Sequence, residues 1–366
     1  MINRTQQEIM QNWGTDNSDT PLVSVRCTTY NHEPYIAQAL DGFLMQKTNF
    51  PFEVIVHDDA STDKTAEIIR EYESRFPKII KPIYETENQY SKRDGSLARI
   101  MAAACKGKYI AFCEGDDYWI DENKLQMQVD FLEMHDDYST YYSNVEGIDK
   151  NGNPLYYVYM IYPFYPSHTI PQSCSLWFGV IGQTATCVTR ASVLSKYPNG
   201  LLANGDMIIS FLAMAKGNVY YSGIPFARHR KVFHGDSWTA KTWGKDMSLW
   251  FYKAYMELFE YSRDVLGKSY SNEKSFLSNF IWMKLKECIK KPSINNFLEL
   301  FEILRLCTFK RKLLYLLIKR KKEQANNIRL RTVIDIYGGG YSLEPYTLRV
   351  SCIFRFPFET PVRKIA

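Results

Sequence analysis

The stretch that decides the fold is residues 109–119, YIAFCEGDDYW, in which a short apolar run is followed by two adjacent carboxylates. A continuous apolar run of this length is typical of a parallel-sheet strand that is buried on both faces. Ligands of open α/β sheets bind beyond the carboxyl ends of such strands, where Asp116 and Asp117 fall. Because consecutive side chains of an extended chain leave on opposite sides, we expect the two aspartates to have separate roles. A surface turn before a helix is the alternative interpretation, so the stretch needs support from its neighbours.

Strand-like and helix-like segments alternate through residues 21–245. Apolar runs predict strands at residues 22–28, 52–57, 79–84, 109–113, 140–145, 182–190 and 219–222. Apolar residues at intervals of three and four predict helices between them, at residues 33–45, 66–72, 97–105, 122–135, 191–196 and 206–215. This alternation predicts an α/β fold, with a Rossmann-like, mostly parallel sheet flanked by helices.

Three further segments lie outside this pattern. Residues 1–20 are polar and are expected to form a loosely attached leader. Residues 246–330 are expected to form a C-terminal helical, basic region, with helices at residues 247–265, 271–290 and 296–307, and residues 331–366 a tail of uncertain structure. Within the α/β part, residues 156–177 are rich in Tyr, Pro and Ser, which predicts a long loop or lid over the carboxyl edge of the sheet.

Charge is divided unevenly along the 366 residues, whose net charge is +5. Residues 1–245 carry 23 Lys and Arg against 28 Asp and Glu, whereas residues 246–366 carry 22 against 12. The acidic first part argues against a nucleic-acid-binding core, and we expect no nucleic-acid partner. The basic second part favours an anionic partner, for which a membrane surface is one physical option.

Cysteine usage and hydropathy suggest a compartment. The 8 cysteines are scattered, with no Cys-x-x-Cys pair, which favours reduced thiols in a cytoplasmic protein. No apolar run approaches the roughly 18 residues that span a bilayer. Residues 309–322, FKRKLLYLLIKRKK, bracket an apolar centre with basic clusters, so as a helix they fit the inner, anionic face of a membrane. A core-packed helix with solvated basic ends is an equally good interpretation of that segment.

Polar motifs follow three of the predicted strands. They are TTYNH at residues 28–32, DDASTD at residues 58–63 and EGDD at residues 114–117. Because the carboxyl ends of parallel strands meet at one edge of a sheet, a ligand lying there would touch all three motifs. In this order and at these spacings the motifs resemble those of family 2 glycosyltransferases with the GT-A fold. The resemblance covers residues 21–237.

The resemblance implies a site for the nucleotide of a sugar donor. Thr28 and Tyr30 match the family loop that cradles the nucleobase, and Tyr30 would pack on the base. Asp59 matches the carboxylate that accepts a hydrogen bond from the base, and Asp58 is its neighbour at the strand end. Asp116 matches the family residue near the ribose. Turn chemistry is the simpler interpretation for Asp58.

The resemblance also implies a divalent cation and a catalytic base. Asp117 matches the metal ligand, the ion being Mg²⁺ or Mn²⁺ that bridges diphosphate oxygens. His234 matches a histidine that meets the metal or the diphosphate in some relatives. Asp206 matches the acidic residue at a helix start that serves as base in inverting members. Gly205 departs from the Glu-Asp pair that the family often has there, and an ordinary helix N-cap is the alternative for Asp206.

Weaker cationic candidates accompany these residues. Arg230 and Lys231 are expected to add contacts to the diphosphate, and His229 is a less favoured ligand. Arg99, on the helix before the acidic strand, is expected to be an ordinary surface residue.

The first hypothesis is therefore an inverting glycosyltransferase of the hexosyltransferase type. It would transfer a sugar from a nucleotide-diphosphate donor, with a UDP-sugar favoured, to a hydroxyl of a glycan or lipid-linked acceptor in surface polysaccharide synthesis. Two alternatives stay open. One is a metal-dependent nucleotidyl- or phosphotransferase, which would normally show a Gly-rich phosphate loop with a Lys, and the sequence has none. The other is a non-catalytic nucleotide-sugar-binding module.

Overall fold

A computed structural model of the chain describes residues 2–14, 20–155, 167–170, 181–198, 200–231, 245–269 and 273–306. All of these residues belong to one compact unit, Met1–Lys310. His234, the segment 309–322 and the tail 331–366 lie outside the described residues. The same holds for the predicted lid at 156–177, apart from a short strand at His168–Ile170.

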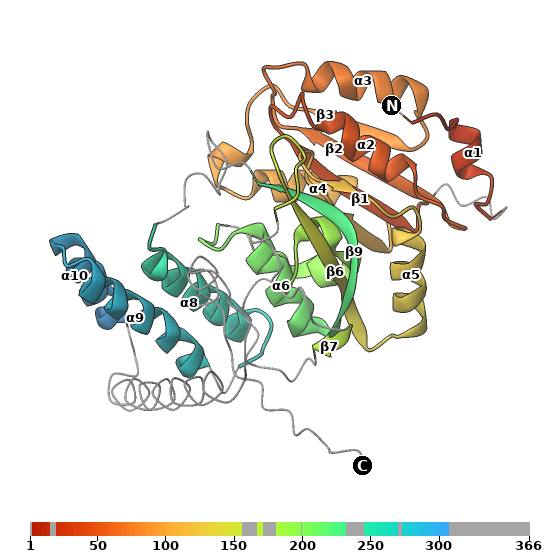
Figure 1. The fold of residues 1–366 in the computed structure, drawn as a ribbon. Coiled ribbons are helices and arrows are strands. Elements are labelled where there is room, and N and C mark those ends of the chain that lie inside the picture. The colour runs from red at the N-terminus through yellow and green to blue at the C-terminus, as the bar shows by residue number, and fades with distance from the viewer. Residues whose placement is uncertain are drawn as a thin grey trace, which may run out of the picture. The chain divides into compact units, whose positions relative to one another are not determined.

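The chain forms a mixed α/β architecture (Figure 1). The strands are β1 (Val23–Thr29), β2 (Phe52–Asp58), β3 (Ile80–Tyr84), β4 (Tyr109–Phe112), β5 (Tyr118–Trp119), β6 (Tyr138–Asp149), β7 (His168–Ile170), β8 (Val188–Arg190) and β9 (Asn218–Lys231). The α-helices are α1 (Gln6–Met10), α2 (Ile36–Leu44), α3 (Thr65–Arg75), α4 (Ser96–Ala104), α5 (Lys124–Met134), α6 (Gly205–Lys216), α8 (Ser248–Asp264), α9 (Glu273–Lys290) and α10 (Ile294–Leu306). Short 3₁₀ helices are η1 (Tyr90–Lys92), η2 (Thr184–Thr186) and η3 (Ala191–Lys196).

One sheet joins the nine strands of the described residues, in the order β3-β2-β1-β4-β8-β6-β9-β5, with β7 paired to β9. The strands β3, β2, β1 and β4 run parallel, as predicted, and β6 and β9 form a second parallel pair. Strand β8 lies antiparallel between β4 and β6, and β5 is antiparallel to β9. The α/β fold predicted from the alternation is therefore confirmed; the sheet is mixed, and its long ladders are parallel.

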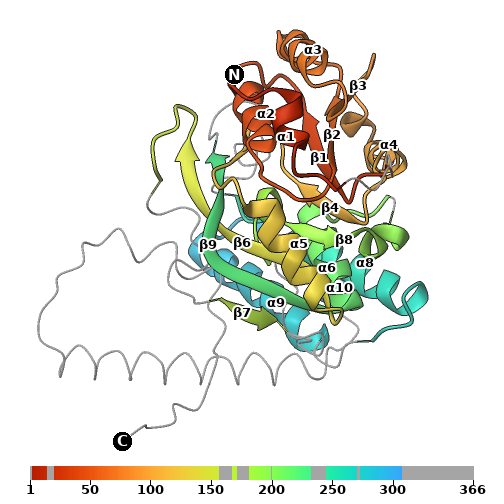
Figure 2. The same ribbon diagram turned by 90° about the vertical axis from the view of Figure 1, so that its right-hand side faces the viewer.

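Helices cover both faces of the sheet. Helices α5 and α6 lie on opposite sides of the β6–β9 pair (Figures 1 and 2). Strands β2 and β4 are buried along their whole length, as is typical of parallel strands inside a sheet that is covered on both faces. Helix α2 brings Phe43 against Trp119 of β5, with ring centroids 4.7 Å apart. This contact connects the helical layer to the strand that directly follows the acidic motif.

The predicted helices after residue 245 are α8, α9 and α10. Aromatic rings fill the space between the first two, with Tyr255 and Phe280 stacked at a centroid distance of 5.7 Å. Phe259 of α8 meets Phe211 of α6 at 6.1 Å, so the helical region contacts the α/β part. No helix among the described residues has both the length and the apolarity to cross a membrane.

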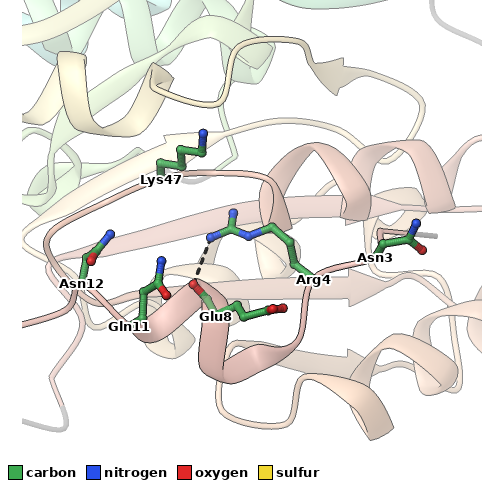
Figure 3. Close-up of a pocket in the computed structure, with 6 residues that line it drawn as sticks. All are labelled: Asn3, Arg4, Glu8, Gln11, Asn12 and Lys47. Atoms are coloured by element: carbon green, nitrogen blue, oxygen red, sulfur yellow. Dashed lines mark hydrogen bonds between the residues drawn. The ribbon is translucent and has the colours of Figure 1, made fainter.

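The expectation that the leader is loosely attached is wrong for its described part. Ile9 is 2% exposed and belongs to the main core. Arg4 donates to the carbonyl oxygens of Leu44, Met45 and Gln46, and so caps the C-terminus of α2, where the helix has no partners of its own. The polar composition of the segment hid these contacts. Figure 3 shows the polar pocket beside Arg4, which contains none of the predicted site residues.

The predicted strand at residues 182–190 is also only partly correct. Its second half is β8, but Thr184–Thr186 form the 3₁₀ helix η2. The turn leaves its polar groups available to neighbouring elements: Ala185 O accepts from Trp119 Nε1 at 2.8 Å, and Thr186 O accepts from Gln128 Nε2 at 2.9 Å. Tertiary hydrogen bonds therefore outweigh the strand preference of these residues.

Replacement of Ile9 by Ala tests whether the leader is part of the fold. We expect a loss of about 2–5 kcal/mol in the free energy of unfolding, because a buried side chain leaves a cavity. Urea unfolding followed by circular dichroism measures this change. Gln7→Ala, at an exposed position of the same helix, is the matched control and should change little. Equal stability of the two variants would show that the leader is dispensable.

Candidate active site

The three polar motifs meet at one edge of the sheet, as predicted. The end of β1 is bonded to both of the others: Asp59 N donates to Thr29 O at 2.9 Å, and Gly115 N donates to Thr28 O at 3.0 Å. These bonds extend the parallel pairing of β1 with β2 and β4 by one step beyond the strands. Thr28, Asp59 and the acidic motif are therefore immediate neighbours.

Reciprocal hydrogen bonds lock the loops after β1 and β2 together. Asn31 Oδ1 accepts from Thr62 N at 2.8 Å, while Asn31 N donates to Ser61 Oγ at 2.9 Å. Asn31 has a φ of 55°, a left-handed conformation that Asn tolerates better than most residues. The preceding residue, Tyr30, is 44% exposed. A large ring that is left open to solvent beside a fixed loop suits the packing of a flat ligand.

Asp58 and Asp59 are both 3% exposed but have different surroundings. Asp59 accepts from Gln89 N at 2.6 Å and from Tyr90 N at 3.0 Å, so it holds the loop that contains η1. Its two oxygens thus both have protein partners, and the contact of Asp59 with a base stays a prediction. Asp58 Oδ1, in contrast, is buried without a hydrogen-bond partner. Such an atom is typical of a place where a ligand or water binds.

The two carboxylates of the acidic motif point to different environments, as strand geometry predicted. Asp117 is 3% exposed, and its Oδ1 accepts from Arg230 N at 2.7 Å while its Oδ2 lies 2.8 Å from His229 Nδ1. The Asp116 side chain is 31% exposed, and its Oδ2 lies 4.0 Å from His32 Nε2. Asp116 is therefore the more accessible of the two.

The end of β9 supplies the cationic groups. Arg230 is not available for phosphate, because its guanidinium donates to Asp116 O, Asp149 O, Lys150 O and Gln38 Oε1. Lys231 is 6% exposed, and burial lowers its pKa to about 8, although Asp117 and Asp206 act in the opposite direction. Lys231 therefore interacts electrostatically with carboxylates from both halves of the site. Arg99 is a surface residue, as expected, and its Nη1 donates to Asp94 O at 2.7 Å.

Asp206 is not the cap of its helix. The N-cap of α6 is Asn204, whose Oδ1 accepts from Met207 N at 3.1 Å. Asp206 is the second helical residue, and its Oδ1 accepts from Thr184 Oγ1 at 2.5 Å. Burial raises the pKa of Asp206, and the hydrogen bond from Thr184 opposes that rise. The N-cap role is thus excluded for Asp206, because Asn204 fills it.

Negative charge is concentrated around these aspartates. Burial raises the pKa of Glu114 well above its usual range, and the carboxylates of Asp206, Asp117 and Asp116 add to the rise. Burial and then Asp117 also raise the pKa of Asp116. Mutual repulsion of this kind would be relieved by a cation. Hard oxygen donors of this type suit Mg²⁺ or Mn²⁺.

The carboxylates of the acidic motif are the donors available to the implied metal. In the part of the chain that the structure describes, no three His, Cys, Asp or Glu side chains are grouped as a metal site. Mg²⁺ is usually held by one or two carboxylates together with substrate phosphates, so a three-ligand protein cage is not required. The acidic motif fits a cation of that kind, bound together with a nucleotide diphosphate.

The sequence predicted no role, or only a minor one, for four residues that the structure places at the site. His32 and Glu114 lie inside the quoted motifs but were given no role. An ionisable residue within such a motif is itself an indication of a functional residue. Thr184 carried no signal, because its contact with Asp206 spans two elements. His229 was the less favoured ligand in the sequence, and its Nδ1 lies 2.8 Å from Asp117 Oδ2.

A close approach of backbone to side chains shapes the floor of the site. A Cβ at Gly115 would lie 2.7 Å from Thr29 Oγ1 and 3.0 Å from His32 Nδ1. Both of these atoms are buried without hydrogen-bond partners, as is Asp58 Oδ1. Glycine is therefore required in the acidic motif for β1 and the motif to pack closely.

Replacing Gly115 with Ala should destabilise the protein by about 1–3 kcal/mol, because strand β1 must move to admit the methyl group. Gly205→Ala is the matched control, since its Cβ would meet only Tyr197 Oη at 3.6 Å. Urea unfolding midpoints of the two variants and of the parent chain provide the comparison. A Gly115→Ala protein as stable as the parent would contradict the close packing.

Comparisons with known proteins agree with the geometry. The model of glycosyl transferase family 2 matches residues 24–196. An uncharacterized protein of Mycobacterium tuberculosis is 43% identical over 130 residues, which are 36% of this chain and 37% of that protein. The Escherichia coli UDP-Glc:alpha-D-GlcNAc-diphosphoundecaprenol beta-1,3-glucosyltransferase WfgD is 32% identical over 133 residues, which are 36% of this chain and 49% of that protein. The matches therefore span between a third and a half of these relatives.

A solved structure has the same fold. It is the S. aureus protein TarS, residues 1–349, in complex with UDP-GlcNAc, with a TM-score of 0.57 and 18% sequence identity. The alignment covers 77% of this chain and 79% of TarS in that structure. Residues 24–196, just under half of the chain, therefore match glycosyl transferase family 2, and the chain shares the fold of that TarS structure.

Proposed function

We propose that the protein is an inverting glycosyltransferase that moves one sugar from a nucleotide-diphosphate donor to a hydroxyl of a glycan or lipid-linked acceptor. The observation that carries the proposal is that Asp206, a partly buried carboxylate that caps no helix, interacts electrostatically with Glu114 and Asp117 of the acidic motif. A UDP-sugar is the favoured donor, because the TarS structure contains UDP-GlcNAc and the E. coli relative is named for UDP-Glc. The lipid diphosphate in that name supports a role in surface polysaccharide synthesis.

The donor nucleotide is assigned to the edge formed by β1, β2 and the acidic motif. Tyr30 provides an exposed ring for the base, and Thr28 lies beside it at the end of β1. Asp58 offers an unpartnered carboxylate oxygen, and Asp59 holds the neighbouring loop in place. Asp116 faces the ribose in this arrangement. All five residues contribute to the nucleotide site of the proposal.

Asp117 is the proposed ligand of the cation, with His234 as a second ligand. Asp116 is the alternative carboxylate for the same role. The hydrogen bonds from Arg230 N and His229 orient the Asp117 carboxylate, as outer partners of metal ligands commonly do. When bound, Mg²⁺ or Mn²⁺ would neutralise the diphosphate leaving group. Lys231 adds positive charge beside the same carboxylates.

Asp206 is the proposed general base. It accepts the proton of the attacking hydroxyl while the acceptor oxygen bonds to the anomeric carbon and the bond from that carbon to the diphosphate breaks. Attack opposite the leaving group inverts the anomeric configuration. The raised pKa of Asp206 makes it a better proton acceptor, and the Thr184 hydroxyl keeps the carboxylate in one orientation.

A thermal-shift panel of UDP-, GDP- and TDP-sugars with and without Mn²⁺ tests the donor site. We expect UDP-sugars to raise the melting temperature, and Mn²⁺ to increase that shift. Asp117→Asn should remove the part that depends on Mn²⁺, whereas Asp116→Asn should weaken the nucleotide and keep the dependence on metal. Asp94→Asn, on an exposed carboxylate, is the control. The reverse behaviour of the two variants would exchange their roles, and the absence of any nucleotide effect would refute the donor site.

Two variants test the base. Asp206→Asn should lower sugar transfer by about 10²- to 10⁴-fold while nucleotide binding stays near that of the parent. Thr184→Val should move the acidic limb of the kcat/KM profile to higher pH, because loss of the hydrogen bond raises the pKa of a base that acts only when deprotonated. Thr184→Ser keeps a hydroxyl and is the control.

Full transfer activity in Asp206→Asn would contradict the assignment of the base. Retained nucleotide binding without transfer or donor hydrolysis in the parent chain would favour a non-catalytic binding module. Release of nucleoside monophosphate from the donor would favour a nucleotidyltransferase.

A further inference from the structure

Helix α10 carries an apolar stripe that faces solvent. Ile294, Phe297, Leu298 and Phe301 are 80%, 54%, 60% and 68% exposed. Their spacing of three and four residues places them on one face of the helix. Ile289, at the end of α9, is 73% exposed and precedes this stripe in the chain. Soluble surfaces rarely leave two phenylalanines and two aliphatic side chains together on one helix face.

The other side of α10 packs against α8 and α9. Ile303 is fully buried there. The two carboxylates of the helix are both paired on that side: Glu299 with Lys284 at 2.5 Å and Glu302 with Lys253 at 2.6 Å. The acidic groups of α10 are thereby neutralised. The helix thus has its apolar stripe toward solvent, while its two ion-paired carboxylates, whose side chains are 40% and 37% exposed, lie beside α9 and α8.

Basic residues lie at both ends of the stripe. Lys290 and Lys291 precede α10, and Arg305 stands in its last turn. The sequence that follows continues this charge, because residues 307–322 contain seven Lys and Arg and no Asp or Glu. An apolar helix face with basic ends is the composition that binds an anionic lipid interface.

We propose that the apolar stripe of α10 inserts into the interface of an anionic membrane. Two other occupants of the stripe are conceivable, the segment 309–322 and a second copy of the chain, and charge favours lipid over both. The basic segment 309–322 would be repelled by the basic ends of the stripe, and a second copy would bring the same basic ends together. This membrane contact rests on the proposed function, because a lipid-linked acceptor lies in such an interface.

Co-sedimentation of the full chain with vesicles tests the stripe. The vesicles are phosphatidylcholine alone and phosphatidylcholine with about one third phosphatidylglycerol. We expect the parent chain to bind the anionic vesicles and to bind the neutral ones weakly. F297S/F301S should bind the anionic vesicles about tenfold more weakly or worse, because two aromatic side chains no longer leave water. M127S/M134S, which changes two exposed apolar residues of α5, is the matched control and should bind like the parent.

Equal vesicle binding by F297S/F301S and the parent would overturn the proposal, as would a parent chain that binds no anionic vesicle. Urea unfolding and light scattering show whether the chain itself or a second copy covers the stripe instead. A lower unfolding midpoint for F297S/F301S would show that the chain itself covers the stripe, and a smaller mass would show that a second copy does. Either result overturns the proposal. UDP-sugar hydrolysis in vesicle-free buffer should be the same in all three proteins. Its absence in the parent would refute the proposed function and leave the vesicle result standing.

Discussion

Asp117 binds the end of β9 through both of its carboxylate oxygens, and the rest of the site depends on this contact. Arg230 N and His229 Nδ1 are the two partners. The two-residue strand β5 follows directly and pairs with the same part of β9, Tyr118 with Arg228 and Trp119 with Ala227. The acidic motif is thereby tied to a strand more than one hundred residues later in the chain. This tie joins the part of the domain that contains β1 and β2 to the part that carries Asp206.

A buried polar network keeps these halves in register. Lys124 is fully buried, its Nζ lies 4.2 Å from the Trp119 ring centroid, and burial lowers its pKa to about 7. Its Nζ donates to Gln128 Oε1 at 2.7 Å, and Gln128 Nε2 donates to Thr186 O. The short helix η2 thus holds the strand after the acidic motif and, through Thr184, the proposed base. A polar network of this kind specifies one arrangement, because each unmet hydrogen bond in the interior would be costly.

The sequence predicted most of the elements and the edge of the sheet at which the motifs meet. Strand β4 and its acidic motif, the helix that begins beside Asp206, and the three C-terminal helices all appear close to their predicted positions. Errors arose where side chains act across long distances in the chain. The polar leader docks through Arg4 and Ile9, and η2 replaces half of a predicted strand, because in both cases the decisive partners lie far away in sequence.

What the sequence by itself determined is the fold class and the set of carboxylates, because hydrophobic periodicity and motif order are local properties. The tertiary structure decided how those carboxylates are used. It buries Asp117 against β9, leaves Asp116 more accessible, assigns Asp59 to the η1 loop and frees Asp206 by giving the cap to Asn204. It also leaves the stripe of α10 exposed, which the helical pattern alone could not distinguish from a core face. Burial and hydrogen-bond partners depend on which elements pack together, and no local pattern contains that information.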